Sequence, residues 1–165
     1  MSRILGIDPG SRKTGYGLLE SVAGTPGYLA CGLVTAMEGD MSERLRVIFE
    51  GVSELLTTYQ PDVVTIESVF VHRNVSSALK LGQARGAVMV AVAQAGLPMV
   101  EYSPRQIKQT VAGNGNADKK QVQEMVQRLL KLDACPSEDA ADALAGAMTH
   151  HYIGRTMDRL KEAGG

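Results

Sequence analysis

The stretch Arg3-Ile4-Leu5-Gly6-Ile7-Asp8-Pro9-Gly10-Ser11 predicts a short buried strand that ends in a carboxylate. Ile4, Leu5 and Ile7 supply the apolar run, and the Pro-Gly pair turns the chain directly after Asp8. A carboxylate at the end of a central strand is a poor core residue and a good metal ligand. Asp also opens Pro-Gly turns without any further role, so this stretch alone leaves both interpretations open.

Three further carboxylates favour the metal interpretation. Glu67 ends the apolar run Val63-Val64-Thr65-Ile66, and Asp139 and Asp142 are spaced to share one face of a helix. Carboxylates at two strand ends and on one helix face are a recurring way to hold divalent metal ions against a phosphodiester. These four side chains therefore form the candidate metal site.

Length and composition are those of an ordinary globular domain, with 165 residues, 44% of them hydrophobic and 21% charged. No apolar run reaches the roughly 18 residues of a membrane span, and the first strand starts too early for a signal peptide. Cys31 and Cys135 lack a CxxC or Cys/His neighbourhood, which predicts reduced thiols in a cytoplasmic protein without membrane contact. We expect one domain over residues 1–153 and a disordered polar tail over residues 154–165.

The charge is unevenly distributed along the chain, although the formal net charge is only −1. Between His72 and Lys131 there are nine Lys and Arg against three acidic residues, a net of +6, which leaves −7 for the remainder. Two divalent ions bound at the carboxylates would make the whole chain positive. A polyanion could then meet a positive face, whereas the alternative is that these cations only solvate helix surfaces.

The order of the expected elements is that of an α/β fold with a mixed sheet. Residues 14–19 and 28–34 predict a hairpin after the first strand. Helical spacing predicts a helix over residues 42–59 with Ser42 as its N-cap, followed by the strand 63–67. Gly15 and Gly17 leave one strand face bare, which suits close approach of a ligand or of another backbone.

Residues 74–95 predict a long helix with small residues at every fourth position. These are Ala78, Gly82 and Gly86. Glycine costs about 1 kcal/mol in a helix interior, so the pair indicates close packing on this side. The partner is either the sheet of the chain itself or a second subunit, and the sequence does not choose between them.

Three more helices are expected after a strand at residues 97–102. Ser103-Pro104 opens the first of these helices, and a turn-rich loop over residues 113–118, which lacks a Walker motif, leads into the second. Lys119 and Lys120 stand at that helix start, where the helix dipole disfavours cations, which points to a role beyond structure. Ser137 is the expected N-cap of the last helix, whose alanines are small enough to seat it tightly on a sheet.

Four motifs now stand in order along the chain: GIDPGSRKTGYG, IESVF, ALKLGQARG and DAADALA. Together with YSPRQIKQTVAG and the loop before Lys119 they cover almost the whole chain, and the set closely resembles the RuvC family of bacterial Holliday junction resolvases. The resemblance implies an endonuclease with the ribonuclease H-like fold, a mixed sheet flanked by helices. It also implies a homodimer that cuts four-way junction DNA and works with the RuvA–RuvB branch-migration complex.

The resemblance assigns roles to particular residues. Metal ligation would fall to the four carboxylates, base contact near the crossover to Phe70, and assistance to catalysis to Lys108 and Lys119. Further DNA contacts are expected from the other cations of the basic segment. These are Arg73, Lys80, Arg85, Arg105 and Lys120.

An all-carboxylate site suits magnesium, because Mg²⁺ prefers hard oxygen ligands and keeps several waters. Two ions about 3.5–4 Å apart can serve the attacking and leaving oxygens of a phosphodiester together. We therefore expect two Mg²⁺ per site, with Mn²⁺ as a substitute.

Two other functions are compatible with parts of the sequence. GIDPGS also resembles the first phosphate loop of the actin, sugar kinase and heat-shock ATPase superfamily, but a second such loop and a second domain are missing from the sequence. A non-catalytic junction-binding module would not need all four carboxylates. Cleavage of a four-way junction, measured against hydrolysis of ATP, discriminates among these functions.

Overall fold

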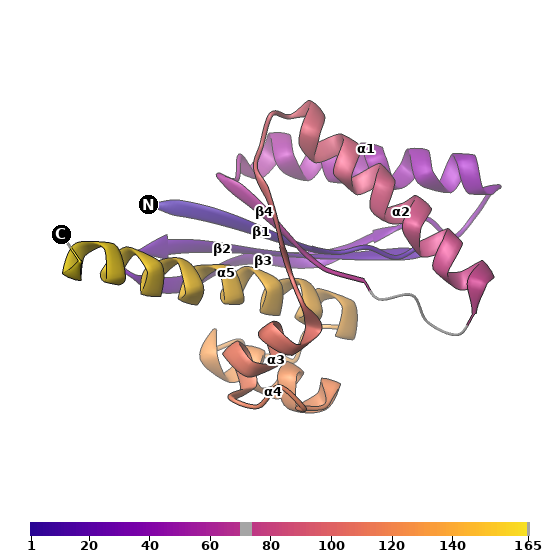
Figure 1. Cartoon of the computed structure of the whole chain (residues 1–165). Coiled ribbons are helices and arrows are strands. Elements are labelled where there is room, and N and C mark those ends of the chain that lie inside the picture. Colours follow the sequence, from indigo (N-terminus) through magenta and orange to yellow (C-terminus); the bar gives the residue numbers. More distant parts are fainter. Residues whose placement is uncertain (70–73, 165) are drawn as a thin grey trace.

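A computed structural model describes residues 1–69 and 74–164. A five-stranded sheet in the order β3-β2-β1-β4-β5 lies between two layers of helices. Helices α1 and α2 cover one face, and α5, with α3 and α4 beyond it, covers the other (Figure 1). The strands are β1 (Ser2–Asp8), β2 (Lys13–Val22), β3 (Thr25–Thr35), β4 (Val63–Glu67) and β5 (Met99–Tyr102). The helices are α1 (Met41–Tyr59), α2 (Val75–Gln94), α3 (Pro104–Ala112), α4 (Lys119–Leu129) and α5 (Glu138–Ala163).

The sheet is mixed, as predicted. Strands β1, β2 and β3 form an antiparallel meander, while β4 and β5 run parallel to β1. Parallel pairing of Ile7 with Ile66 brings the carboxyl ends of β1 and β4 side by side. The residues that follow these two, Asp8 and Glu67, thus end adjacent strands at one edge of the sheet.

Alternation along the strands decides which helix layer each side chain meets. On β1, Leu5 and Ile7 pack in the core beneath α1 and α2, whereas Ile4 packs in the core beneath α5. On β4, Ile66 belongs to the first core and Val63 to the second. The same alternation directs Asp8 and Glu67 toward α5.

Glycines in β1 and β2 let α5 lie directly on the sheet. A Cβ on Gly6 would collide with the carbonyl oxygen of Ala143, and one on Gly15 with that of Asp139. A Cβ on Gly17 would lie 2.5 Å from Leu144 Cγ. The bare strand face predicted from the sequence therefore receives another part of the backbone, and the alanines of α5 are buried against it.

Of the two N-caps that were predicted by name, Ser137 is confirmed and Ser42 is corrected. Asn74, Ser103 and Ser137 each accept a hydrogen bond from a backbone N–H in the first turn of their helix. The N-cap of α1, however, is Asp40 rather than Ser42. The hydroxyl of Ser42 donates to the Asp40 carboxylate at 2.7 Å, because the carboxylate is the stronger acceptor and already receives the helix N–H groups.

The carboxyl-terminal segment differs from the predicted disordered tail. Helix α5 continues to Ala163 without interruption. Arg155 donates to the carbonyl oxygen of Gly24 in the β2–β3 turn, and Thr156 donates to the carbonyl of Tyr152 one turn earlier. This tertiary contact to the turn anchors a polar stretch for which helical periodicity gave no apolar face. Across the described part of the chain, none of the helices is both long and apolar enough to cross a membrane.

Candidate active site

The site is built where β1 and β4 end beneath the first turns of α5. Asp8 and Glu67 point from the strand ends toward this helix, and Asp139 and Asp142 project from it. Gly15 brings the main chain of Asp139 into contact with β2. The four predicted carboxylates, from four distant points of the sequence, thus gather at one end of the sheet.

Burial raises the pKa of Asp8, Asp142 and Glu67 in this cluster. Burial raises the pKa of Asp8 to about 8, and the charges of Asp142, Asp139 and Glu67 act in the same direction. Burial likewise raises the pKa of Asp142 to about 6. The pKa of Glu67 is also raised by burial, although the ammonium groups of Lys119 and Lys108 oppose the shift.

Lys119 is the cation that α4 brings to the cluster. Its ammonium lies 2.6 Å from Glu138 Oε1 and 3.8 Å from Asp142 Oδ2. The hydrogen bond to Glu138 raises the pKa of Lys119, with the charge of Asp142 adding to the effect. The helix dipole disfavours cations at the start of α4. The carboxylates of Glu138 and Asp142 on α5 explain why Lys119 is nevertheless found there.

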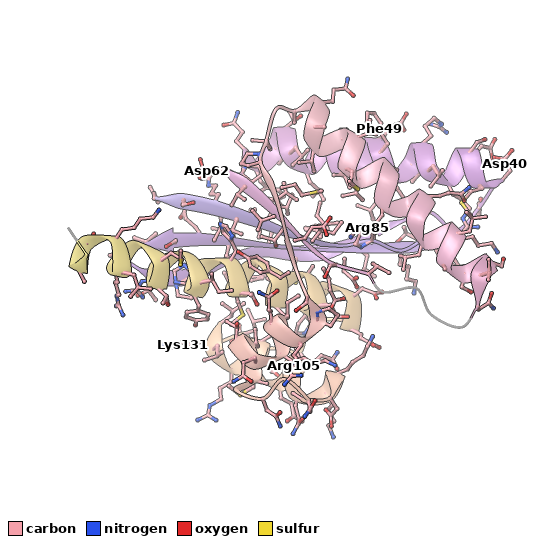
Figure 2. The ribbon with its side chains drawn as sticks, viewed as in Figure 1. Asp40, Phe49, Asp62, Arg85, Arg105 and Lys131 are labelled. Atoms are coloured by element: carbon pink, nitrogen blue, oxygen red, sulfur yellow. The ribbon has the colours of Figure 1, made fainter. Side chains whose placement is uncertain are left out.

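Most of the other residues that were predicted to contact DNA differ in how exposed they are. Lys80, Arg105 and Lys120 are exposed, and Lys108 is partly buried near Glu67. Figure 2 places Arg105 on the lobe formed by α3 and α4. Phe70 and Arg73 lie outside the described residues.

Arg85 was predicted to contact DNA at the protein surface, but its side chain is largely buried. Its side chain is only 14% exposed and forms an ion pair with Glu101. Figure 2 shows it between α2 and the sheet. Its hydrogen bonds are therefore directed into the protein.

The donor set fits a hard divalent cation, because it consists of carboxylate oxygens without thiol or imidazole. The described residues, 1–69 and 74–164, contain no group of three or more Asp, Glu, His or Cys side chains arranged to hold a metal ion. Carboxylates of like charge repel one another, and closer approach has an electrostatic cost that a bound cation offsets. The structure thus supports a shared electrostatic environment for the four acids, and ligation by them stays a prediction.

The chain matches a known protein family. The family model described as crossover junction endodeoxyribonuclease RuvC matches residues 4–150, which include all four carboxylates and both lysines. The chain belongs to the RuvC family. A RuvC from Hydrogenovibrio crunogenus is 54% identical over 162 residues, and the aligned residues cover 98% of this chain and 94% of the length of that protein. A RuvC from Tolumonas auensis is 52% identical over 160 residues, which cover 97% of this chain and 92% of the length of that protein.

Solved structures of RuvC agree with the fold. Thermus thermophilus RuvC is 36% identical and superposes with a TM-score of 0.85. The superposition covers 93% of this chain and 96% of the Thermus thermophilus chain. The same protein in complex with a Holliday junction substrate gives a TM-score of 0.88. The yeast mitochondrial resolvase Ydc2, at 14% identity and a TM-score of 0.65, shares the fold. The phosphate-loop ATPase and the non-catalytic module gain no support from these RuvC matches.

Several residues around the site were not found by sequence reasoning. Glu138 was not among the predicted site residues, and its carboxylate pairs with Lys119. Arg44 donates to the carbonyl oxygen of Ser11 at 2.6 and 3.0 Å and to that of Ala36 at 3.1 Å, which fixes the turn after Asp8. Glu101 pairs with Arg85. No local pattern marks these contacts, because each joins segments far apart in the chain.

Proposed function

We propose that this RuvC family member is a metal-dependent endodeoxyribonuclease that resolves four-way DNA junctions by paired nicks in strands of like polarity. The observation that carries the proposal is the convergence of Asp8, Glu67, Asp139 and Asp142 at one end of the sheet, with Lys119 paired to Asp142. The structural match to a RuvC in complex with a Holliday junction supports the substrate class. A DNA junction as substrate fits a cytoplasmic site of action.

The four carboxylates would hold two Mg²⁺, with Mn²⁺ as a possible substitute. Bound there, the ions would supply an activated water and charge stabilisation for the leaving oxygen. Burial raises the pKa of Asp8 and Asp142, so a bound cation would offset the cost of their negative charge and would displace their protons.

The lysines would balance the charge of the scissile phosphate. Lys119 already faces the carboxylates from α4, and Lys108 approaches Glu67 from α3. The charges of both lysines oppose the burial that raises the pKa of Glu67. We propose that Phe70 stacks on an unpaired base near the crossover, a contact worth about 1–3 kcal/mol. Arg73, Lys80, Arg105 and Lys120 would contact the phosphate backbone.

A homodimer would supply the two sites that paired nicks require. Helix α2 buries Ala84 and Val88 against its own sheet, while a Cβ on Gly82 or Gly86 would meet nothing within 4 Å. Leu79 and Val90, both on α2, are 64% and 58% exposed. This apolar, small-residue side of α2 supports the second-subunit alternative left open by the sequence. RuvA–RuvB would act with the dimer on the same junction.

The deciding experiment incubates the full-length chain with a synthetic four-way junction in which each strand is labelled in turn. We expect symmetric cuts in two strands of like polarity with Mg²⁺, none with EDTA, and none in a linear duplex of the same sequence. ATP should not be hydrolysed. ATP turnover without junction cleavage would overturn the proposal.

A further inference from the structure

Arg85 joins helix α2 to the end of strand β4. Its Nη1 donates to the main-chain carbonyl of Glu67 at 2.8 Å, and its Nη2 donates to Glu101 Oε1 at 2.7 Å. With a side chain only 14% exposed, it is directed into the protein, between α2 and the sheet (Figure 2). A guanidinium donates in two directions from one rigid plane, so it can hold both partners at once.

The carbonyl that Arg85 binds lies just past the end of a strand ladder. Pairing of β1 with β4 ends at Ile7 and Ile66, one residue before Glu67. On the β5 side, the N–H of Ser68 donates to the carbonyl of Tyr102 at 2.8 Å, and its hydroxyl donates to the same oxygen at 3.3 Å. The peptide group between Glu67 and Ser68 is therefore held at its N–H by the Tyr102 carbonyl of β5 and at its carbonyl oxygen by Arg85 of α2.

We infer that Arg85 is a positioning residue for Glu67. By fixing the main chain at the last residue of β4, it sets the direction in which the Glu67 side chain leaves the strand. The ion pair with Glu101, the β5 residue that pairs with Ile66, in turn fixes the guanidinium. This inference rests on the proposed function of the carboxylate cluster, because orientation of Glu67 matters only if that side chain binds the metal.

The same arrangement links the proposed dimer helix to the proposed metal site. Arg85 directly precedes Gly86, one of the two glycines on the side of α2 that is left open for a second subunit. A subunit packed on α2 would restrain the helix from which Arg85 reaches Glu67.

Arg3 offers a matched control within the same sheet. Its Nη1 donates to the main-chain carbonyl of Tyr59 at 2.9 Å, and its Nε pairs with Glu20 at 3.1 Å. It thus makes the same two kinds of bond as Arg85, but near the start of β1, whereas the carboxylates lie where β1 ends. Arg3→Gln and Arg85→Gln remove equivalent interactions and differ in their distance from the site.

The test compares Arg85→Gln, Arg85→Lys and Arg3→Gln in the full-length chain. Binding of Mn²⁺ is measured by calorimetry without DNA, and the Mg²⁺ dependence of junction cleavage is measured in parallel. Arg85→Gln should weaken Mn²⁺ binding and raise the half-saturating Mg²⁺ concentration, each by about tenfold, the usual effect of removing a group that orients a ligand. Arg85→Lys, which keeps one donor, should fall between the wild type and Arg85→Gln. Arg3→Gln should leave both quantities unchanged even if it lowers stability.

Unchanged Mn²⁺ binding in Arg85→Gln would overturn the inference. So would weaker metal-free junction binding with a reduced salt slope, because that is the signature of a phosphate contact. If Arg85→Gln does not fold, Arg85→Lys decides in the same way. A wild-type chain that binds no Mn²⁺ and cuts no junction would instead refute the proposed function.

Discussion

At the scale of single residues, burial raises the pKa of Asp8, Glu67 and Asp142. We expect Asp8→Asn, Glu67→Gln, Asp139→Asn and Asp142→Asn each to lower junction cleavage by about 10²-fold or more, because each removes one charge from the proposed metal site with little change of shape. Junction binding, measured by gel shift without metal, should persist. Glu50→Gln, which alters a surface carboxylate on α1, is the control. Full cleavage by any one of the four variants would remove that residue from the site.

The raised pKa of Asp8 predicts how stability depends on pH. Its pKa is about 8 in the folded protein and 3.8 as the reference for the unfolded chain, so the folded state binds more protons between these values. Stability of the metal-free protein should therefore fall as pH rises from about 4 to 8, by on the order of 2–5 kcal/mol. Asp142, with its pKa raised to about 6, adds to the fall in the lower part of this range.

Urea unfolding in EDTA at pH 5 to 8 measures this dependence. Asp8→Asn should be more stable than the wild type at pH 8 and show a flatter profile. Saturating Mg²⁺ should restore stability to the wild type alone. A wild-type profile as flat as that of Asp8→Asn would contradict the origin assigned to the shift.

At the scale of secondary structure elements, the position of α5 on the sheet depends on glycines of β1 and β2. Gly15→Ala should destabilise the protein by about 1–3 kcal/mol, because the new methyl group would collide with the carbonyl of Asp139. Cleavage should fall as well, since the backbone that carries Asp139 must shift. The matched control is Gly27→Ala on β3, where a Cβ would lie 3.4 Å from the Glu20 carbonyl. Equal effects of the two substitutions on stability and cleavage would contradict this account of the helix position.

At the scale of the whole molecule, the proposed dimer depends on the exposed side of α2, which would bring two active sites together. Gly82→Leu has free space within the chain, so it should fold and yet prevent close approach of a second subunit. We expect a monomer by sedimentation and open-circle rather than linear product from a cruciform plasmid. Gly154→Leu on α5, where a Cβ also meets nothing within 4 Å, should remain dimeric. A Gly82→Leu dimer that still gives linear product would place the interface elsewhere.

The elements of the fold and the identity of the four acids followed from the sequence alone. Period-two and helical spacing, together with a cap such as Ser137, act over a few residues and can therefore be predicted from local patterns. The motifs that carry the family resemblance are local as well. Their order along the chain was sufficient to predict a ribonuclease H-like sheet with Asp8 and Glu67 at the ends of two strands.

Only the tertiary structure decided which side chains meet. Arg85 carries the same charge as the exposed Lys80 on the same helix, and only the packing of α2 on the sheet directs it to the Glu67 carbonyl. The contact of Arg155 with Gly24 extends α5 beyond the predicted boundary for a similar reason. These contacts join residues 18 and 131 positions apart, so they depend on strand register and helix packing, which no short stretch of the chain specifies.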